Sequence, residues 1–181
     1  GLAPFSWDRI VERHGHLAAI RESMLALEDL PSATRLALVA KLSDTLAQFV
    51  VARNWLGTDR AERIAGEAKE RSTVNIAARA FGDDMQNLIA HLRATGQLTA
   101  GLILRALLSG NLDLFGAALA ELSGLPYGRV SALLNDRGGN GLSALLRRAG
   151  LPESTYAAFR VALEASHEVG YVDSGDGAAR L

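Results

Sequence analysis

Apolar side chains recur along this chain at steps of three and four residues, the spacing that places them on one face of an α-helix. The clearest stretch is 32–55, where the apolar stripe contains Leu36, Val39, Leu46 and Phe49. Alternating runs of Val, Ile and Thr, which predict strands, are nearly absent. The pattern therefore predicts an all-α protein of about ten short antiparallel helices.

Glycines predict where these helices end, because a helix commonly terminates on one left-handed residue and glycine adopts that conformation without steric cost. The glycines in such positions are Gly57, Gly82, Gly96, Gly110, Gly124, Gly150 and Gly170. Pro126 and Pro152 then open the following helices. The predicted helices are 6–14, 16–30, 32–56, 58–81, 83–95, 99–109, 111–123, 126–135, 141–149 and 152–169.

Two segments resemble capping boxes, residues 59–62 and residues 83–86. In each, the leading aspartate can accept a hydrogen bond from an otherwise unpaired amide of the first helical turn. A glutamate or glutamine three residues later can accept a hydrogen bond from the backbone amide of that aspartate. We expect both segments to begin helices.

A weak repeat occupies the second half of the chain. Residues 119–126 align with residues 145–152, and residues 91–98 form a looser copy. Each copy ends a helix, turns at a glycine and restarts, which predicts helical hairpins stacked in an α-solenoid-like, HEAT-like manner. We expect one domain over 1–169, with lobes 1–82 and 83–169 as the alternative, and a disordered tail over 170–181.

Charge and composition narrow the function classes. The 19 Lys and Arg residues nearly balance the 20 Asp and Glu residues, so bulk charge gives no reason to expect a nucleic-acid partner. The longest apolar stretch, 101–108, is too short to cross a membrane. The absence of cysteine suits a reducing compartment, which we expect to be the cytoplasm. The chain starts at Gly1 without an initiator Met, as a fragment of a longer protein would.

A family resemblance is strongest over residues 98–152. It rests on the run 98–111, on 117–122 and 124–126, and on Ala149-Gly150-Leu151-Pro152. Over about 30–165 the chain resembles a bacterial family catalogued only as a domain of unknown function, all-helical and loosely HEAT-like. The resemblance implies a bacterial origin, a helical-repeat fold and a regulatory or scaffolding role, and it supplies no catalytic residues.

Arg105 is a candidate site residue because its predicted helix is apolar on nearly every side. A buried guanidinium needs a carboxylate, and Asp113 and Glu121 on the next helix are its candidate partners. We interpret Arg105 as a structural buried charge. The alternative is a contact with a ligand or partner.

Basic residues gather between residues 129 and 160. The candidates for an anion or partner contact are Arg129, Arg137, Arg147 and Arg148. They could bind a phosphate or an acidic protein segment. The alternative is a solvated face that acids elsewhere balance. Nucleic acid is disfavoured further because no aromatic residues interleave with these arginines.

The sequence offers no catalytic, cofactor or metal motif. The histidines lack the spacing of a zinc site, and no Gly-x-Ser-x-Gly segment marks a nucleophile. The leading hypothesis is therefore a non-enzymatic helical-repeat module that is regulatory or scaffolding and binds a protein partner. The alternatives are an anion or phospholigand binder centred on Arg129–Arg148, and an unrecognised helical enzyme.

Overall fold

The computed structural model describes residues 30–136, 138 and 140–176. This part of the chain contains eight α-helices and one short 3-10 helix, and no strand, so the all-α prediction is confirmed. The predicted helices 6–14 and 16–30 lie outside the described residues, except for residue 30. None of the described helices has the length and apolar character needed to cross a membrane.

The chain divides into two compact units, residues 1–92 and 93–181. The sequence predicted one domain over 1–169, with a division at 82/83 as the alternative, and the helix that follows residue 82 lies mostly in the first unit. A long-range contact helps to explain why. The carboxylate of Asp84 accepts hydrogen bonds from the Ser32 backbone N–H at 3.1 Å and from its hydroxyl at 2.5 Å.

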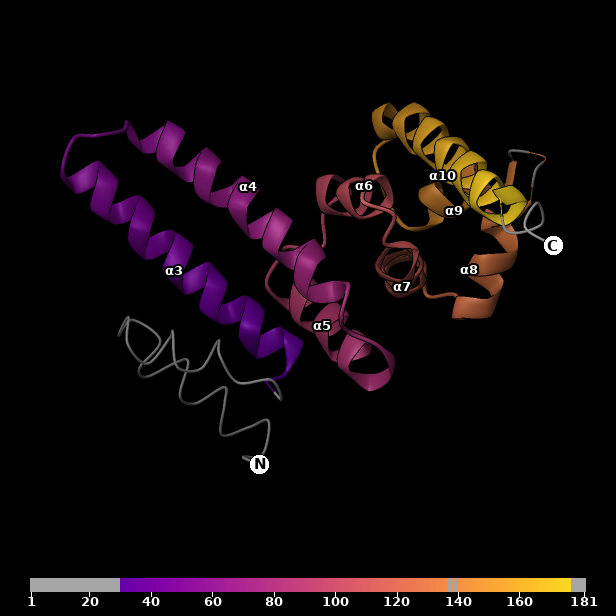
Figure 1. The fold of residues 1–181 in the computed structure, drawn as a ribbon, viewed down its shortest axis with the longest axis horizontal. Helices are drawn as coiled ribbons and strands as arrows, with labels where there is room; N and C mark the ends of the chain where they lie inside the picture. The colour runs from indigo at the N-terminus through magenta and orange to yellow at the C-terminus, as the bar shows by residue number, and fades with distance from the viewer. Residues whose placement is uncertain (1–29, 137, 139, 177–181) are drawn as a thin grey trace. The chain divides into compact units, whose positions relative to one another are not determined.

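The first unit is dominated by an antiparallel helical hairpin of α3 (Ser32–Ala52) and α4 (Thr58–Ala77), which pack along each other (Figure 1). The next helix is α5 (Gly82–Ala94). Burial is concentrated at the proximal end of the hairpin, where Leu36 and Leu38 of α3 and Val74 of α4 are buried. Over the distal part, residues 41–72, which the structure describes completely, Ala61 is the one buried residue.

The second unit contains five α-helices and the 3-10 helix. They are α6 (Ala100–Leu108), α7 (Leu112–Ser123), α8 (Tyr127–Leu134), α9 (Asn140–Arg148), η1 (Glu153–Thr155) and α10 (Tyr156–Asp176). Helix α7 packs against α6, α8 and α9, and α10 packs against both α6 and α9. The fully buried rings of Phe115 on α7 and Phe159 on α10 stack with their centroids 6.2 Å apart.

The contact of α10 with α6 joins the first and last helices of the second unit. In an open solenoid each repeat contacts its sequence neighbours alone. The second unit has the contact of a closed bundle, and the predicted α-solenoid-like arrangement is not confirmed. The three repeat copies nevertheless share a local conformation, because Gly96, Gly124 and Gly150 all have positive φ, at 71°, 71° and 77°.

Two predicted helix ends are wrong. The residue with positive φ after α3 is Asn54, at 57°, whereas Gly57 has a φ of −67° and caps the start of α4. Helix α10 continues through Gly170 to Asp176, so Gly170 does not end it. One glycine within a helix costs about 1 kcal/mol, which neighbouring helical residues can outweigh.

The predicted capping boxes are also wrong, because both helices start before the leading aspartate. Asp59 lies in the first turn of α4, and its N-cap makes no side-chain hydrogen bond. Two side chains that sequence reasoning did not select do cap helices. Thr99 accepts from the amide of Leu102 at 3.2 Å and starts α6, and Asn111 accepts from the amide of Leu114 at 3.1 Å and starts α7.

Candidate functional site

Arg105 lies on α6 and is partly buried, and the prediction that its charge is structural stays a prediction. One side of this short helix faces solvent, and a long side chain can reach water from there. Arg105 makes an interaction of its own, and the two carboxylates considered as its partners also contact other groups. Glu121 accepts from Arg93 at 2.8 Å, and Asp113 is hydrogen-bonded to Tyr127.

The predicted basic cluster is only partly brought together. Arg148 donates from Nε to the carbonyl of Ser123 at 3.0 Å, and Arg147 lies 3.7 Å from a carboxylate oxygen of Glu153. Arg129 is exposed in the first turn of α8, and Arg137 lies outside the described residues. The contact of Arg148 satisfies a terminal carbonyl of α7, which is a structural task.

Acid and histidine side chains do not form a metal centre in the described part of the chain, where no three of them gather in a suitable way. A different candidate surface lies on the hairpin α3–α4. This surface is the distal part of the hairpin, where several large apolar side chains are exposed.

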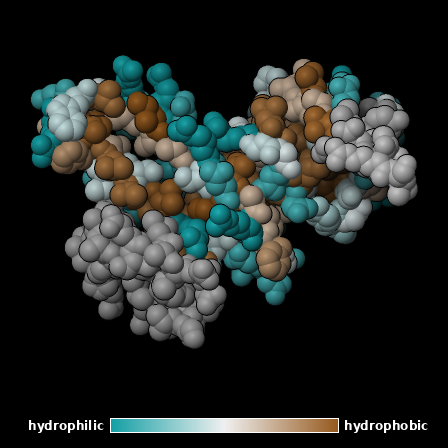
Figure 2. All heavy atoms as spheres, viewed as in Figure 1, coloured by the Kyte–Doolittle hydropathy of each residue, from teal (hydrophilic) through white to brown (hydrophobic). Residues whose placement is uncertain are grey.

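Large apolar side chains are exposed on this distal part, as Figure 2 shows for the hairpin. The exposed fractions are 55% for Leu46, 44% for Phe49, 63% for Trp55 and 45% for Ile64. We call these four residues the apolar flank. Exposing so much apolar area costs free energy in water, and contiguous patches of this kind commonly mark interaction sites.

The aromatic members of the apolar flank are held in place by an arginine. The rings of Phe49 and Trp55 meet edge to face, with centroids 5.7 Å apart. The guanidinium carbon of Arg53 lies 4.1 Å from the centroid of Phe49 and 5.8 Å from that of Trp55. Such cation–π contacts order exposed aromatic rings. The left-handed turn at Asn54 sends the chain back so that Trp55 reaches Phe49.

Helical geometry places Leu46, Phe49 and Ile64 on one side of the hairpin. Asp44 of α3 forms an ion pair with Lys69 of α4, which marks the opposite side. Phe49 follows Asp44 by five residues and Ile64 precedes Lys69 by five, so each is rotated by about 140° from the ion pair. The step from Asp44 to Phe49 runs forward along α3, and the step from Lys69 to Ile64 runs backward along α4. Because the two helices are antiparallel, both steps turn in the same direction, so Phe49 and Ile64 lie on the same side of the hairpin.

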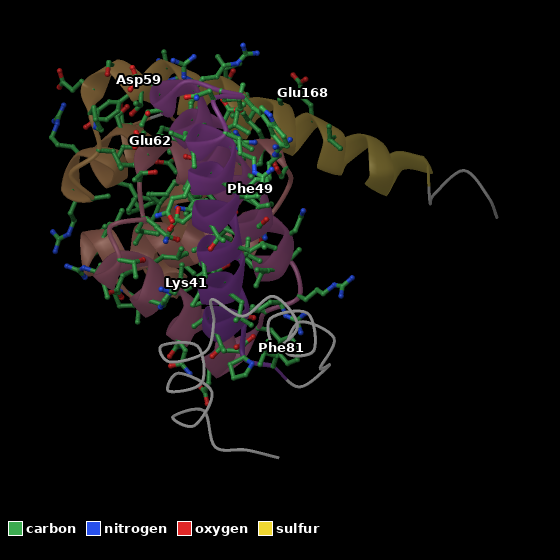
Figure 3. The ribbon with its side chains drawn as sticks, turned by 90° about the vertical axis from the view of Figure 1, so that its left-hand side faces the viewer. Lys41, Phe49, Asp59, Glu62, Phe81 and Glu168 are labelled. Carbon is green, nitrogen blue, oxygen red and sulfur yellow. The ribbon has the colours of Figure 1, made fainter. Side chains whose placement is uncertain are left out.

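The charges of the hairpin are divided between the two sides. Arg60 and Arg71 lie four and seven residues from Ile64 and share its helix face, as Arg53 shares that of Phe49. The other side, which we call the acidic flank, carries Asp44, Asp59, Glu62 and Glu70, with Lys41 and Lys69. Figure 3 shows Phe49 on one side of α3, and Asp59 and Glu62 on the other. Glu67 lies three residues from Ile64 and four from Arg71, so it borders the same face as these arginines, whereas Arg63 lies on the face turned away from α3.

Sequence reasoning placed Leu46 and Phe49 on one apolar stripe but did not identify that stripe as a candidate binding surface. The periodicity was read correctly, since both residues share a helix face. It does not reveal whether another helix covers that face. The charge pattern of α4 could have indicated this surface. Arginines lie on the helix face of Ile64, and most acids lie on other faces.

The geometry thus defines a class, an all-helical protein with an exposed apolar flank on the hairpin α3–α4. A family model described as "Uncharacterised protein conserved in bacteria (DUF2336)" matches residues 1–181, so the chain belongs to this bacterial family. The predicted resemblance is confirmed, and the match extends beyond the expected 30–165 to the whole chain. Comparisons with curated proteins and with solved structures gave no match.

Proposed function

We propose that this protein is a non-enzymatic interaction module, regulatory or scaffolding in role, that binds a protein partner through the apolar flank of the hairpin α3–α4. The observation that carries the proposal is the exposure of Leu46, Phe49, Trp55 and Ile64 on one side of two packed helices. Exposed aromatic and large aliphatic residues next to arginine have the composition of energetically important interface positions. A cytoplasmic location is part of this proposal, because the chain has no cysteine.

The helical hairpin suits this role mechanically. Its proximal end is buried around Leu36, Leu38 and Val74, which anchors the two helices. Its distal end has almost no buried residues, so a partner can approach without displacing any part of the core. Side chains on packed helices keep fixed positions, which lowers the entropy cost of binding relative to a loop.

Affinity capture from the native bacterium, followed by mass spectrometry, tests the proposal. Leu46→Glu places a charge in the apolar flank without disturbing a buried position, so the variant is expected to fold, which circular dichroism checks. We expect the wild-type chain to recover a reproducible partner and Leu46→Glu to lose it. The matched control is Leu108→Glu, which changes an exposed leucine of the second unit and is expected to retain the partner.

Two results would contradict the proposal. One is the absence of any reproducible partner for the wild-type chain. The other is a partner that Leu46→Glu recovers as well as the wild type does, because the binding surface would then lie elsewhere.

A further inference from the structure

We infer that the occupant of the apolar flank is an amphipathic α-helix of the partner whose apolar stripe is bordered by acidic residues, and that it packs as a third helix against α3 and α4. This inference rests on the proposed function and adds the chemistry of the partner. Three observations carry it: the shape of the surface, the sign of its charges and the arrangement of its aromatic rings.

The shape favours a helix. The apolar flank takes Leu46 and Phe49 from α3 and Ile64 from α4, so it spans both helices of an antiparallel pair. A third helix can place its ridges of side chains against both helices at once and complete a three-helix bundle. An extended segment would leave its backbone amides and carbonyls against apolar side chains, whereas a helix satisfies these groups internally.

The charges beside the apolar flank favour an acidic partner. Arg53, Arg60 and Arg71 are exposed on this side of the hairpin, and the exposed acids of the distal hairpin lie mainly on the other side. A helix with glutamates or aspartates beside its apolar stripe would therefore meet charges of opposite sign. A second copy that used the same flank would place these arginines near their own copies, which disfavours a symmetric dimer.

The aromatic rings argue against a single-stranded nucleic acid. A base needs a free ring face on which to stack. In this structure the guanidinium of Arg53 covers a face of Phe49 at 4.1 Å, and the edge-to-face contact with Trp55 takes up a further side. The aliphatic side chains of Leu46 and Ile64 complete the surface, and they offer contacts that suit leucine-like side chains better than bases.

Synthetic peptides test the inference directly. The probe is a fluorescein-labelled helical peptide with leucines at positions i, i+3, i+4 and i+7 and glutamates beside that stripe. Its matched partner carries lysines in place of the glutamates. Binding to the full-length chain is followed by fluorescence anisotropy. We expect the acidic peptide to bind about tenfold more tightly than the basic one, because three exposed ion pairs each contribute a modest amount.

Charge reversal in the protein supplies the second arm. The double variant Arg60→Glu/Arg71→Glu should reverse the preference, so that the basic peptide binds more tightly. Arg129→Glu, at an exposed arginine of the second unit, should leave the preference unchanged. Raising the salt concentration should weaken the acidic peptide more than it weakens an uncharged, glutamine-flanked version.

Each contrary outcome has a defined meaning. Equal binding of the acidic and basic peptides overturns the charge selection. Failure of both peptides to bind, or tighter binding of a single-stranded oligonucleotide, overturns the helical occupant. In all of these cases the proposed function still stands if Leu46→Glu loses the captured partner. If Leu46→Glu captures the partner as well as the wild type does, the proposed function is contradicted as well.

Discussion

The distal hairpin and the second unit are built from helices with similar apolar spacing, yet their large apolar side chains differ in burial. Phe115 on α7 is fully buried and stacks on Phe159, whereas Phe49 on α3 is exposed over nearly half of its surface. Among the residues that the structure describes, the two phenylalanines differ in the number of helices around them. Helix α7 is surrounded by α6, α8 and α9, and Phe115 also reaches α10.

Two packed helices cannot enclose a core by themselves. Each helix buries one face against the other, and any apolar side chain on a flank remains in water. Leu46, Trp55 and Ile64 are in this position. Contiguous exposed apolar patches of this kind are typical of interaction sites.

Truncating the two phenylalanines gives the largest expected effect and tests the comparison most directly. Phe115→Ala should lower the free energy of unfolding by about 3–5 kcal/mol, because it removes a fully buried ring and leaves a cavity. Phe49→Ala should lower it by less than about 1 kcal/mol, mainly through the lost contact with Arg53. Urea unfolding followed by circular dichroism measures both. Similar losses would show that Phe49 belongs to a core.

Two glycine substitutions should have effects of opposite sign. Gly124 ends α7 with a φ of 71°, so Gly124→Ala should destabilise the second unit by about 1–2 kcal/mol. Gly66 lies exposed within α4, with nothing within 4 Å of an added Cβ atom. Gly66→Ala should therefore stabilise the hairpin by about 0.5–1 kcal/mol. Urea unfolding again measures both. A destabilising Gly66→Ala would show that this part of α4 is not a regular helix.

A smaller effect concerns Tyr127, which is 50% exposed and yet differs from the aromatics of the apolar flank. Its ring lies over Gly116 and its hydroxyl is hydrogen-bonded to Asp113. Partial burial, together with the nearby charge of Asp113 and the hydrogen bond to it, raises the pKa of the Tyr127 phenol above its ordinary value of 10.0. The folded protein therefore holds this proton more tightly than the unfolded chain does.

The sign of the pH effect follows from that shift. The stability contributed by the neutral phenol is present below about pH 10 and is lost as the pH rises through the higher pKa of the folded state. The wild type should thus lose stability more steeply than Tyr127→Phe above about pH 10. Titration of the phenolate absorbance should show a component, missing in Tyr127→Phe, that ionises above the ordinary range. If the phenol of Tyr127 ionised over the same pH range as the other tyrosines, the raised pKa of Tyr127 would be contradicted.

The sequence by itself determined the helical class and most helix positions. The spacing of apolar residues and the glycines at helix ends are local signals, and a helix forms from contacts within a few residues. For this reason the predicted helix 111–123 differs by one residue from α7, which the structure places at Leu112–Ser123. The family membership was also readable, because the run from residue 98 to residue 152 carries its pattern.

Only the tertiary structure decided which apolar faces are covered and which charges meet. The stripe containing Leu46 and Phe49 looks the same in sequence as one that is buried, because periodicity describes a face and not its neighbours. The ion pair of Asp44 with Lys69 joins residues 25 positions apart. It shows which side of the hairpin lies opposite the apolar flank. The contact of α10 with α6 likewise depends on packing over long sequence distances, so the closed bundle and the exposed apolar flank could not be derived from local patterns.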